Sequence, residues 1–87
     1  MEFEWDDYKE QSNYSKHRIR FRQIIPAFFD PRRLEYEDPE QSEERIRLIG
    51  QVHGRVVFVV YTWRGENVRI ISARKATKDE QEKYNAG

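Results

Sequence analysis

Apolar side chains first recur with helical spacing, over residues 21–28, where Phe21, Ile24, Ile25 and Phe28 stand at i, i+3, i+4 and i+7. This spacing predicts a helix with one apolar face. Pro26 lies inside the segment, so the helix either begins late, with the proline in its first turn, or is kinked. Asp30-Pro31 predicts its end.

The spacing changes to that of strands in the second half of the chain. Residues 46–52 and 68–73 alternate in part between apolar and polar side chains, while 56–61 is apolar on both faces and fits a central strand. His53-Gly54 and Arg64-Gly65 lie where hairpin turns are expected. The pattern therefore predicts a three-stranded antiparallel meander.

The N-terminal segment predicts a short strand followed by a helix. Phe3 and Trp5 alternate with acidic residues, as in a half-exposed strand, and Asp7 with Glu10 resembles a capping box. The helix should run from residue 8 to about residue 17. Its face is unusual, because a polar stripe at helical spacing is formed by Lys9, Asn13 and Lys16.

The remaining segments are polar. Residues 32–43 form an acidic connection with a brief strand at 33–36, and Thr77 with Glu80 forms a capping box for a last helix to about Tyr84. We expect that last helix to be peripheral. The order predicts one α+β domain over residues 1–87, with a short N-terminal strand, a two-helix hairpin, a three-stranded meander and a short C-terminal helix. The helices should cover one face of the sheet.

Composition excludes several classes of protein. The chain has 87 residues, of which 14% are aromatic, and this share argues against disorder. It has no Cys and two His, too few for a disulfide scaffold, a zinc-Cys cluster or a histidine metal cage. No apolar run approaches 18 residues, and the N-terminus lacks a signal-peptide core. We therefore expect a cytoplasmic domain without metal or cofactor.

The net charge of zero hides blocks of opposite sign. Basic residues dominate 16–33 and 64–75, whereas 35–44 carries six acidic residues. Five basic side chains lie near the predicted strand ends: Arg55, Arg64, Arg69, Arg74 and Lys75. Such side chains can bind phosphates and stabilise a phosphoryl transition state. Tyr61 and Trp63 lie nearby and can stack on bases. The alternative is that these arginines pair with the 35–44 segment while the two aromatics pack the sheet.

His17 stands at the predicted end of the first helix. One interpretation is a positive charge at the helix C-terminus, and the other is a general acid or base. Lys75 and Tyr61 are further candidates for proton transfer. Spacing alone does not rank them.

Two stretches together resemble the BrnT-type toxin family. The first stretch is Phe3-Glu4-Trp5-Asp6 with Lys9, Asn13 and Lys16-His17. The second comprises Arg45, Ile49-Gly50, Tyr61-Thr62-x-Arg64-Gly65 and the run from Arg69 to Thr77, with Glu80 and Tyr84. The likeness spans residues 3–84. It departs at Arg18, where the family usually has Gly, and at Phe21-Arg22-Gln23-Ile24, where the family usually reads Phe-Glu-Glu-Ala.

The resemblance implies a RelE-like fold and a ribonuclease toxin of a type II toxin–antitoxin pair. Such a toxin cuts RNA without metal, inhibits translation, and is neutralised by a BrnA-like antitoxin through which the complex binds operator DNA. A catalytic role is expected for Arg64, Arg69, Arg74, Lys75, His17 and Tyr61, and RNA binding for Lys9, Lys16, Arg55 and Trp63. The alternatives are a non-catalytic protein-interaction module and an RNA-binding protein that does not cleave.

Overall fold

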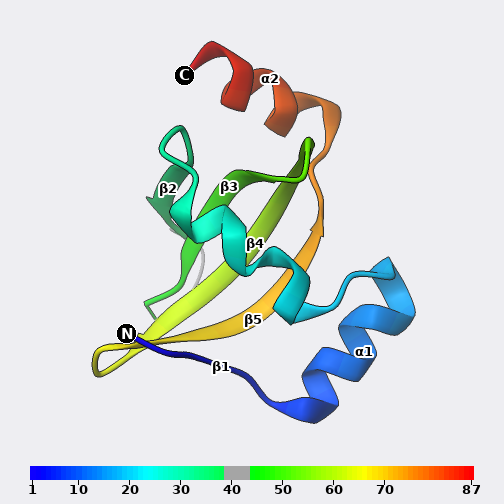
Figure 1. The fold of residues 1–87 in the computed structure, drawn as a ribbon, viewed down its shortest axis with the longest axis vertical. Helices are drawn as coiled ribbons and strands as arrows, with labels where there is room; N and C mark the ends of the chain where they lie inside the picture. Colours follow the sequence, from blue (N-terminus) through cyan, green and yellow to red (C-terminus); the bar gives the residue numbers. More distant parts are fainter. Residues whose placement is uncertain (39–43) are drawn as a thin grey trace.

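A computed structural model of the chain describes residues 1–38 and 44–87, and within them five strands form one sheet with helices on both faces (Figure 1). The elements are β1 (Phe3–Glu4), α1 (Asp7–His17), the 3-10 helix η1 (Phe21–Phe29), β2 (Leu34–Glu37), β3 (Ile46–Val52), β4 (Arg55–Arg64), β5 (Asn67–Lys75) and α2 (Lys78–Ala86). The strand order is β1-β5-β4-β3-β2. The α+β class and the meander are confirmed, and residues 39–43 of the acidic connection lie outside the described part.

The sheet is mixed rather than wholly antiparallel. β1 runs parallel to β5, and the other pairs are antiparallel. The reason is that the chain leaves β1 through two helices instead of a hairpin, so no tight turn sets the direction of β1. β1 pairs only with Val68 and Arg69, which leaves the rest of that edge of β5 to α1.

The main core lies between the sheet and η1. The predicted apolar face of residues 21–28 is confirmed, because Phe21, Ile24, Ala27 and Phe28 are all buried. The helix is 3-10 rather than α, and Pro26 lies within it on an exposed position. Gly50 on β3 allows η1 to approach closely, since a Cβ there would lie 3.0 Å from the carbonyl oxygen of Ala27.

The helix α1 begins one residue earlier than expected. Its N-cap is Asp6, whose carboxylate accepts a hydrogen bond from the backbone N–H of Lys9, so the prediction of Asp7 as the cap was wrong. The helix ends at Arg18, which takes the left-handed conformation (φ 58°) that usually favours glycine. Its backbone N–H still donates to the carbonyl of Tyr14 at 2.7 Å.

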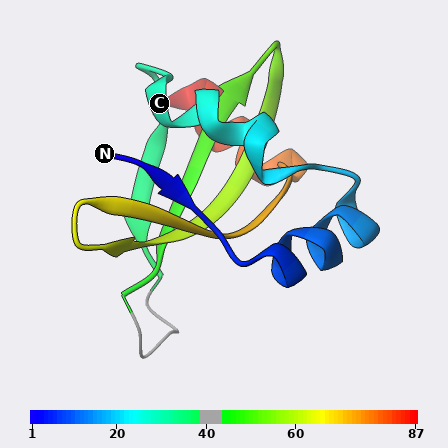
Figure 2. The ribbon, with the colours of Figure 1, turned by 60° about the horizontal axis from the view of Figure 1, so that its bottom comes forward.

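A buried polar residue attaches α1 to the sheet. Asn13 is 7% exposed, and its side-chain amide both donates to the carbonyl of Ala73 (2.8 Å) and accepts from the N–H of Ala73 (3.1 Å). It also donates to the carbonyl of Ile19 at 3.2 Å. The Asn13 amide thus makes the two hydrogen bonds to Ala73 that a neighbouring strand would otherwise make. Figure 2 shows β1 and α1 following one another on the β5 side of the sheet.

The helix α2 packs on the face opposite η1, so the expectation that all helices share one face was wrong. The reason is strand alternation, which turns Ile49 and Phe58 away from the main core, where they pack with the buried Tyr84 of α2. The predicted capping box of Thr77 and Glu80 is confirmed. The Tyr84 hydroxyl donates to Asp30 at 2.6 Å, which ties α2 to the end of η1.

The carboxylates that hold α2 should make the fold sensitive to acid. Burial alone raises the pKa of Asp30, but hydrogen bonds donated by Tyr84 and by the N–H groups of Arg32 and Gln51 outweigh it and lower that pKa below 3.8. Burial likewise raises the pKa of Glu80, but the hydrogen bonds from Arg74 and Thr77 lower it below 4.5. Groups whose pKa is lower in the folded state stabilise it above their ordinary pKa.

We therefore expect the free energy of unfolding to fall as pH drops below about 4.5 and on through the lowered pKa values. Tyr84→Phe should lower it by about 1–3 kcal/mol at pH 6, because a hydrogen bond to a charged group is lost, and by less at pH 3. Denaturant titrations at the two pH values measure this. Tyr8→Phe, at an exposed hydroxyl, is the matched control, and an equal loss in both variants would contradict the prediction.

Candidate functional site

The three arginines predicted to clamp phosphate share one face of the sheet. Arg74 stands opposite Phe58 and Arg69 opposite Thr62, and directly paired residues point to the same side. This is the face that α2 covers at one end. Arg74 is bound by Glu80 through two hydrogen bonds of 2.8 and 3.0 Å, and its guanidinium lies 4.1 Å from the centre of the Phe58 ring.

The same register spreads these arginines apart. Arg69 and Arg74 are five residues apart on β5, which corresponds to roughly 16 Å. Arg64 lies at the β4–β5 turn, where its Nε is 3.9 Å from a carboxylate oxygen of Glu4. The arginines therefore share a surface, but they do not converge on a single phosphate.

Tyr61 faces the opposite side, toward the main core. It is 3% exposed, and its hydroxyl donates to Glu35 at 2.8 Å. Burial raises the pKa of Tyr61 above its ordinary value, and the hydrogen bond to Glu35 raises it further. Strand alternation thus places Tyr61 on the face opposite the three arginines, with its hydroxyl engaged by Glu35. Trp63 lies on the same side, 47% exposed, edge-on to the Tyr61 ring.

Three of the other predicted basic residues come together at the opposite end of β4 and β5. His17, Arg55 and Lys75 line a hollow of about 450 Å³ between the end of α1, the β3–β4 turn and the start of α2. The floor includes Ile19 and Val57. The Val57–Lys75 pair and the Arg64–Asn67 pair are seven residues apart along β4, which corresponds to roughly 23 Å. The basic residues around this hollow and the three arginines therefore form separate surfaces.

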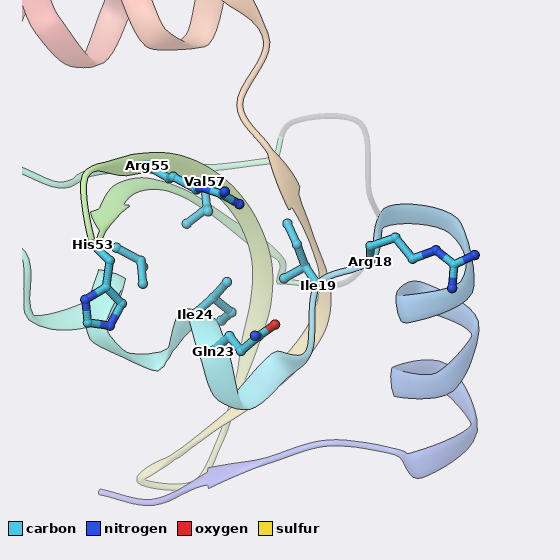
Figure 3. A pocket seen from close by; sticks show the side chains of 8 residues that line it. Arg18, Ile19, Gln23, Ile24, His53, Arg55 and Val57 are labelled. Atoms are coloured by element: carbon cyan, nitrogen blue, oxygen red, sulfur yellow. The ribbon is translucent and has the colours of Figure 1, made fainter.

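A second hollow of about 550 Å³ adjoins the first. Four residues line both hollows: Arg18, Ile19, Arg55 and Val57. Figure 3 shows Ile19, Ile24 and Val57 around its centre, with His53 and Arg55 at its rim and the Arg18 side chain directed toward α1. We call the two hollows together the basic hollow.

Two turns with unusual backbone geometry build this site. Arg18 (φ 58°) turns the chain from α1 so that Ile19 enters the hollow, and His53 (φ 48°) with Gly54 (φ 81°) makes the tight β3–β4 turn that presents Arg55. Arg18 and His53 were not among the predicted site residues. The turn at His53-Gly54 was visible in the sequence, but its position opposite the end of α1 follows only from the three-dimensional arrangement.

The basic hollow carries positive charge that no ion pair neutralises in the part of the chain described. Within residues 1–38 and 44–87, no carboxylate lines either hollow or forms an ion pair with His17, Arg18, His53, Arg55 or Lys75. Several arginines elsewhere have acidic partners, as in Arg20–Glu10, Arg47–Asp38 and Arg74–Glu80. The part of the chain described also shows no group of three or more His, Cys, Asp or Glu placed to hold a metal ion.

The fold and this hollow define a small α+β protein that presents a concentrated positive charge to a polyanion. The chain belongs to the family of ribonuclease toxins, BrnT, of type II toxin–antitoxin systems, whose family model matches residues 5–80. It is therefore an endoribonuclease toxin with an antitoxin partner. A search of curated proteins gave no match. No helix in the described segments is long and apolar enough to span a membrane.

Proposed function

We propose that this toxin cuts RNA in the basic hollow without a metal ion and thereby inhibits translation in the cytoplasm. The observation that carries the proposal is a set of four basic residues, without acidic partners among the described residues, that line the two adjoining hollows: His17, His53, Arg55 and Lys75. A phosphodiester approaching these hollows meets positive charge that no neighbouring carboxylate cancels. Two of the four are histidines, which suit proton transfer near neutral pH.

In the proposed reaction, the ribose 2′-oxygen attacks the adjacent phosphorus while the bond from phosphorus to the 5′-oxygen breaks. The products are a 2′,3′-cyclic phosphate and a 5′-hydroxyl, so no water is consumed. His17 takes the proton of the 2′-hydroxyl, and the ammonium group of Lys75 gives a proton to the leaving 5′-oxygen. The guanidinium of Arg55 stabilises the extra negative charge of the transition state.

The partner in this proposal is a BrnA-like antitoxin that covers the basic hollow, and the toxin–antitoxin complex binds operator DNA through the antitoxin. Family membership supports an antitoxin in general. The open, positively charged hollow supports occlusion as the mode of inhibition, because acidic side chains of a partner would gain most where the charge is unneutralised.

Two double variants with the same change in net charge test the location. Arg55→Gln/Lys75→Gln removes two charges from the basic hollow, and Arg64→Gln/Arg69→Gln removes two from the far end of β4 and β5. We expect the first to cut a labelled RNA at least about 100-fold more slowly, because transition-state stabilisation is lost, and the second to stay within about fivefold of wild type. Cleavage is measured as initial rate in EDTA.

Other outcomes would overturn specific parts of the proposal. A larger loss in the Arg64/Arg69 variant would move the reaction to the open sheet face. Cleavage that stops in EDTA and returns with Mg²⁺ would contradict metal independence. RNA that is bound but left intact by wild-type protein in both buffers would favour the non-cleaving alternatives.

A further inference from the structure

We propose that the outer face of α1 binds single-stranded RNA beside the cut site, with Tyr8 stacking on a base. This inference rests on the proposed function, because it extends the RNA path from the basic hollow. Five side chains line a shallow depression of about 290 Å³ on that face: Tyr8, Gln11, Ser12, Ser15 and Lys16. We call them the α1 stripe.

The spacing of the α1 stripe gives it one continuous surface. Its members stand at i, i+3, i+4, i+7 and i+8, so they follow one another along the same side of the helix. Asn13 lies on a different side, where it is bonded to β5. The stripe therefore takes no part in holding α1 to the sheet, and packing does not explain its composition.

The side chains of the α1 stripe match the parts of a nucleotide. Tyr8 is 82% exposed, the highest value among the exposed large hydrophobic residues, and no ring contact to it occurs in the described residues. An exposed aromatic ring can stack on any base. The amide of Gln11 and the hydroxyls of Ser12 and Ser15 can bond to base edges and sugars, and Lys16 can contact phosphate.

The two lysines of α1 lie on the same side of the helix. Lys9 lies within about 20° of Lys16 around the helix axis, at 100° per residue, so both lysines flank one side of the stripe. Glu10 lies on the far side of the helix, where it is bound to Arg20 at 3.2 Å, and Asp7 lies beside the edge of the stripe opposite the lysines. The stripe itself carries Lys16 and no carboxylate, and Lys9 adds a second positive charge beside it, which complements a phosphate backbone.

The stripe also leads to the proposed cut site. Lys16 directly precedes His17, which lies about 100° further round the helix and lines the basic hollow. From Tyr8 to Lys16 the helix rises roughly 12 Å, the length of about three stacked nucleotides. RNA is favoured over a protein occupant, because a protein interface would be expected to bury several apolar side chains here, whereas the stripe has one aromatic among polar residues.

Binding of a fluorescent RNA whose 2′-hydroxyls are methylated tests the stripe without cleavage. We expect Tyr8→Ala to raise Kd about tenfold or more, and Tyr8→Phe to stay within about twofold, because the ring still stacks. Tyr36→Ala, at another exposed tyrosine, is the matched control and should bind like wild type. Lys9→Gln/Lys16→Gln should reduce the slope of log K against log salt by about 1.4.

An unchanged Kd for Tyr8→Ala, or an equal loss in Tyr36→Ala, would overturn the inference. So would a Tyr8→Ala protein that binds RNA normally but binds its antitoxin more weakly, because the stripe would then be a protein interface. Failure of the proposed function is seen separately, as wild-type protein that binds the methylated RNA but leaves unmodified RNA uncut.

Discussion

His17→Ala is expected to lower the rate of RNA cleavage by about 10²–10⁴-fold, the usual contribution of a positioned general base. The side chain stands at the last turn of α1 and lines the basic hollow together with Arg55 and Lys75. A proton acceptor there can act on a 2′-hydroxyl while the two cations hold the phosphate. The loss should appear in kcat, because the imidazole is assigned to the chemical step rather than to binding.

The pH profile separates proton transfer from a structural role. A histidine that transfers a proton should produce a limb in the rate–pH profile of wild-type protein, and this limb should be missing in His17→Ala and His17→Gln. A residue that only supports the end of α1 would lower the rate evenly at every pH.

His53→Ala serves as the matched control, since the same residue type lines the adjoining hollow, and we expect a loss of less than about tenfold. A greater loss in His53→Ala than in His17→Ala would assign the proton transfer to the β3–β4 turn. Full activity in His17→Ala would contradict the mechanism, though not the location of the site.

Periodicity was sufficient to predict most of the fold. Alternation identified β3 and β5, and a continuous apolar run identified β4. The turn at His53-Gly54 was placed correctly because only a few residue types accept two positive φ values in succession. The capping box at Thr77 marked the start of α2. The face on which α2 packs could not be predicted, since a single buried Tyr84 provides no apolar stripe to orient it.

The site was harder to predict, because the distance between two residues in the sequence does not show whether their side chains lie at the same end and on the same face of the sheet. Arg74 and Lys75 are neighbours, yet Lys75 belongs to the basic hollow while Arg74 lies on the face bearing Phe58 and is bound by Glu80. The face on which Tyr61 lies could not be predicted for a related reason. Side chains of successive strand residues point to opposite faces of the sheet, and because β4 is apolar on both faces, its pattern does not show which face is covered.

Asn13→Ala is expected to lower the free energy of unfolding by about 2–4 kcal/mol, a large effect for a helix residue outside the apolar core. The change removes three hydrogen bonds and leaves the N–H and carbonyl of Ala73, on a buried stretch of β5, without their partners. Gln11→Ala, on the exposed side of the same helix, should change stability by no more than about 0.5 kcal/mol. Chemical denaturation of the two variants measures the difference.

Asn13→Asp distinguishes hydrogen bonding from packing, because its shape is almost unchanged. A carboxylate can still accept from the N–H of Ala73, but it cannot donate to the carbonyls of Ala73 and Ile19, and it brings a charge into a buried position. We expect it to be at least as destabilising as Asn13→Ala. Stability equal to wild type would mean that the amide pairing with β5 contributes little. Because Ile19 also lines the basic hollow, both variants should lose RNA cleavage even at temperatures where they remain folded.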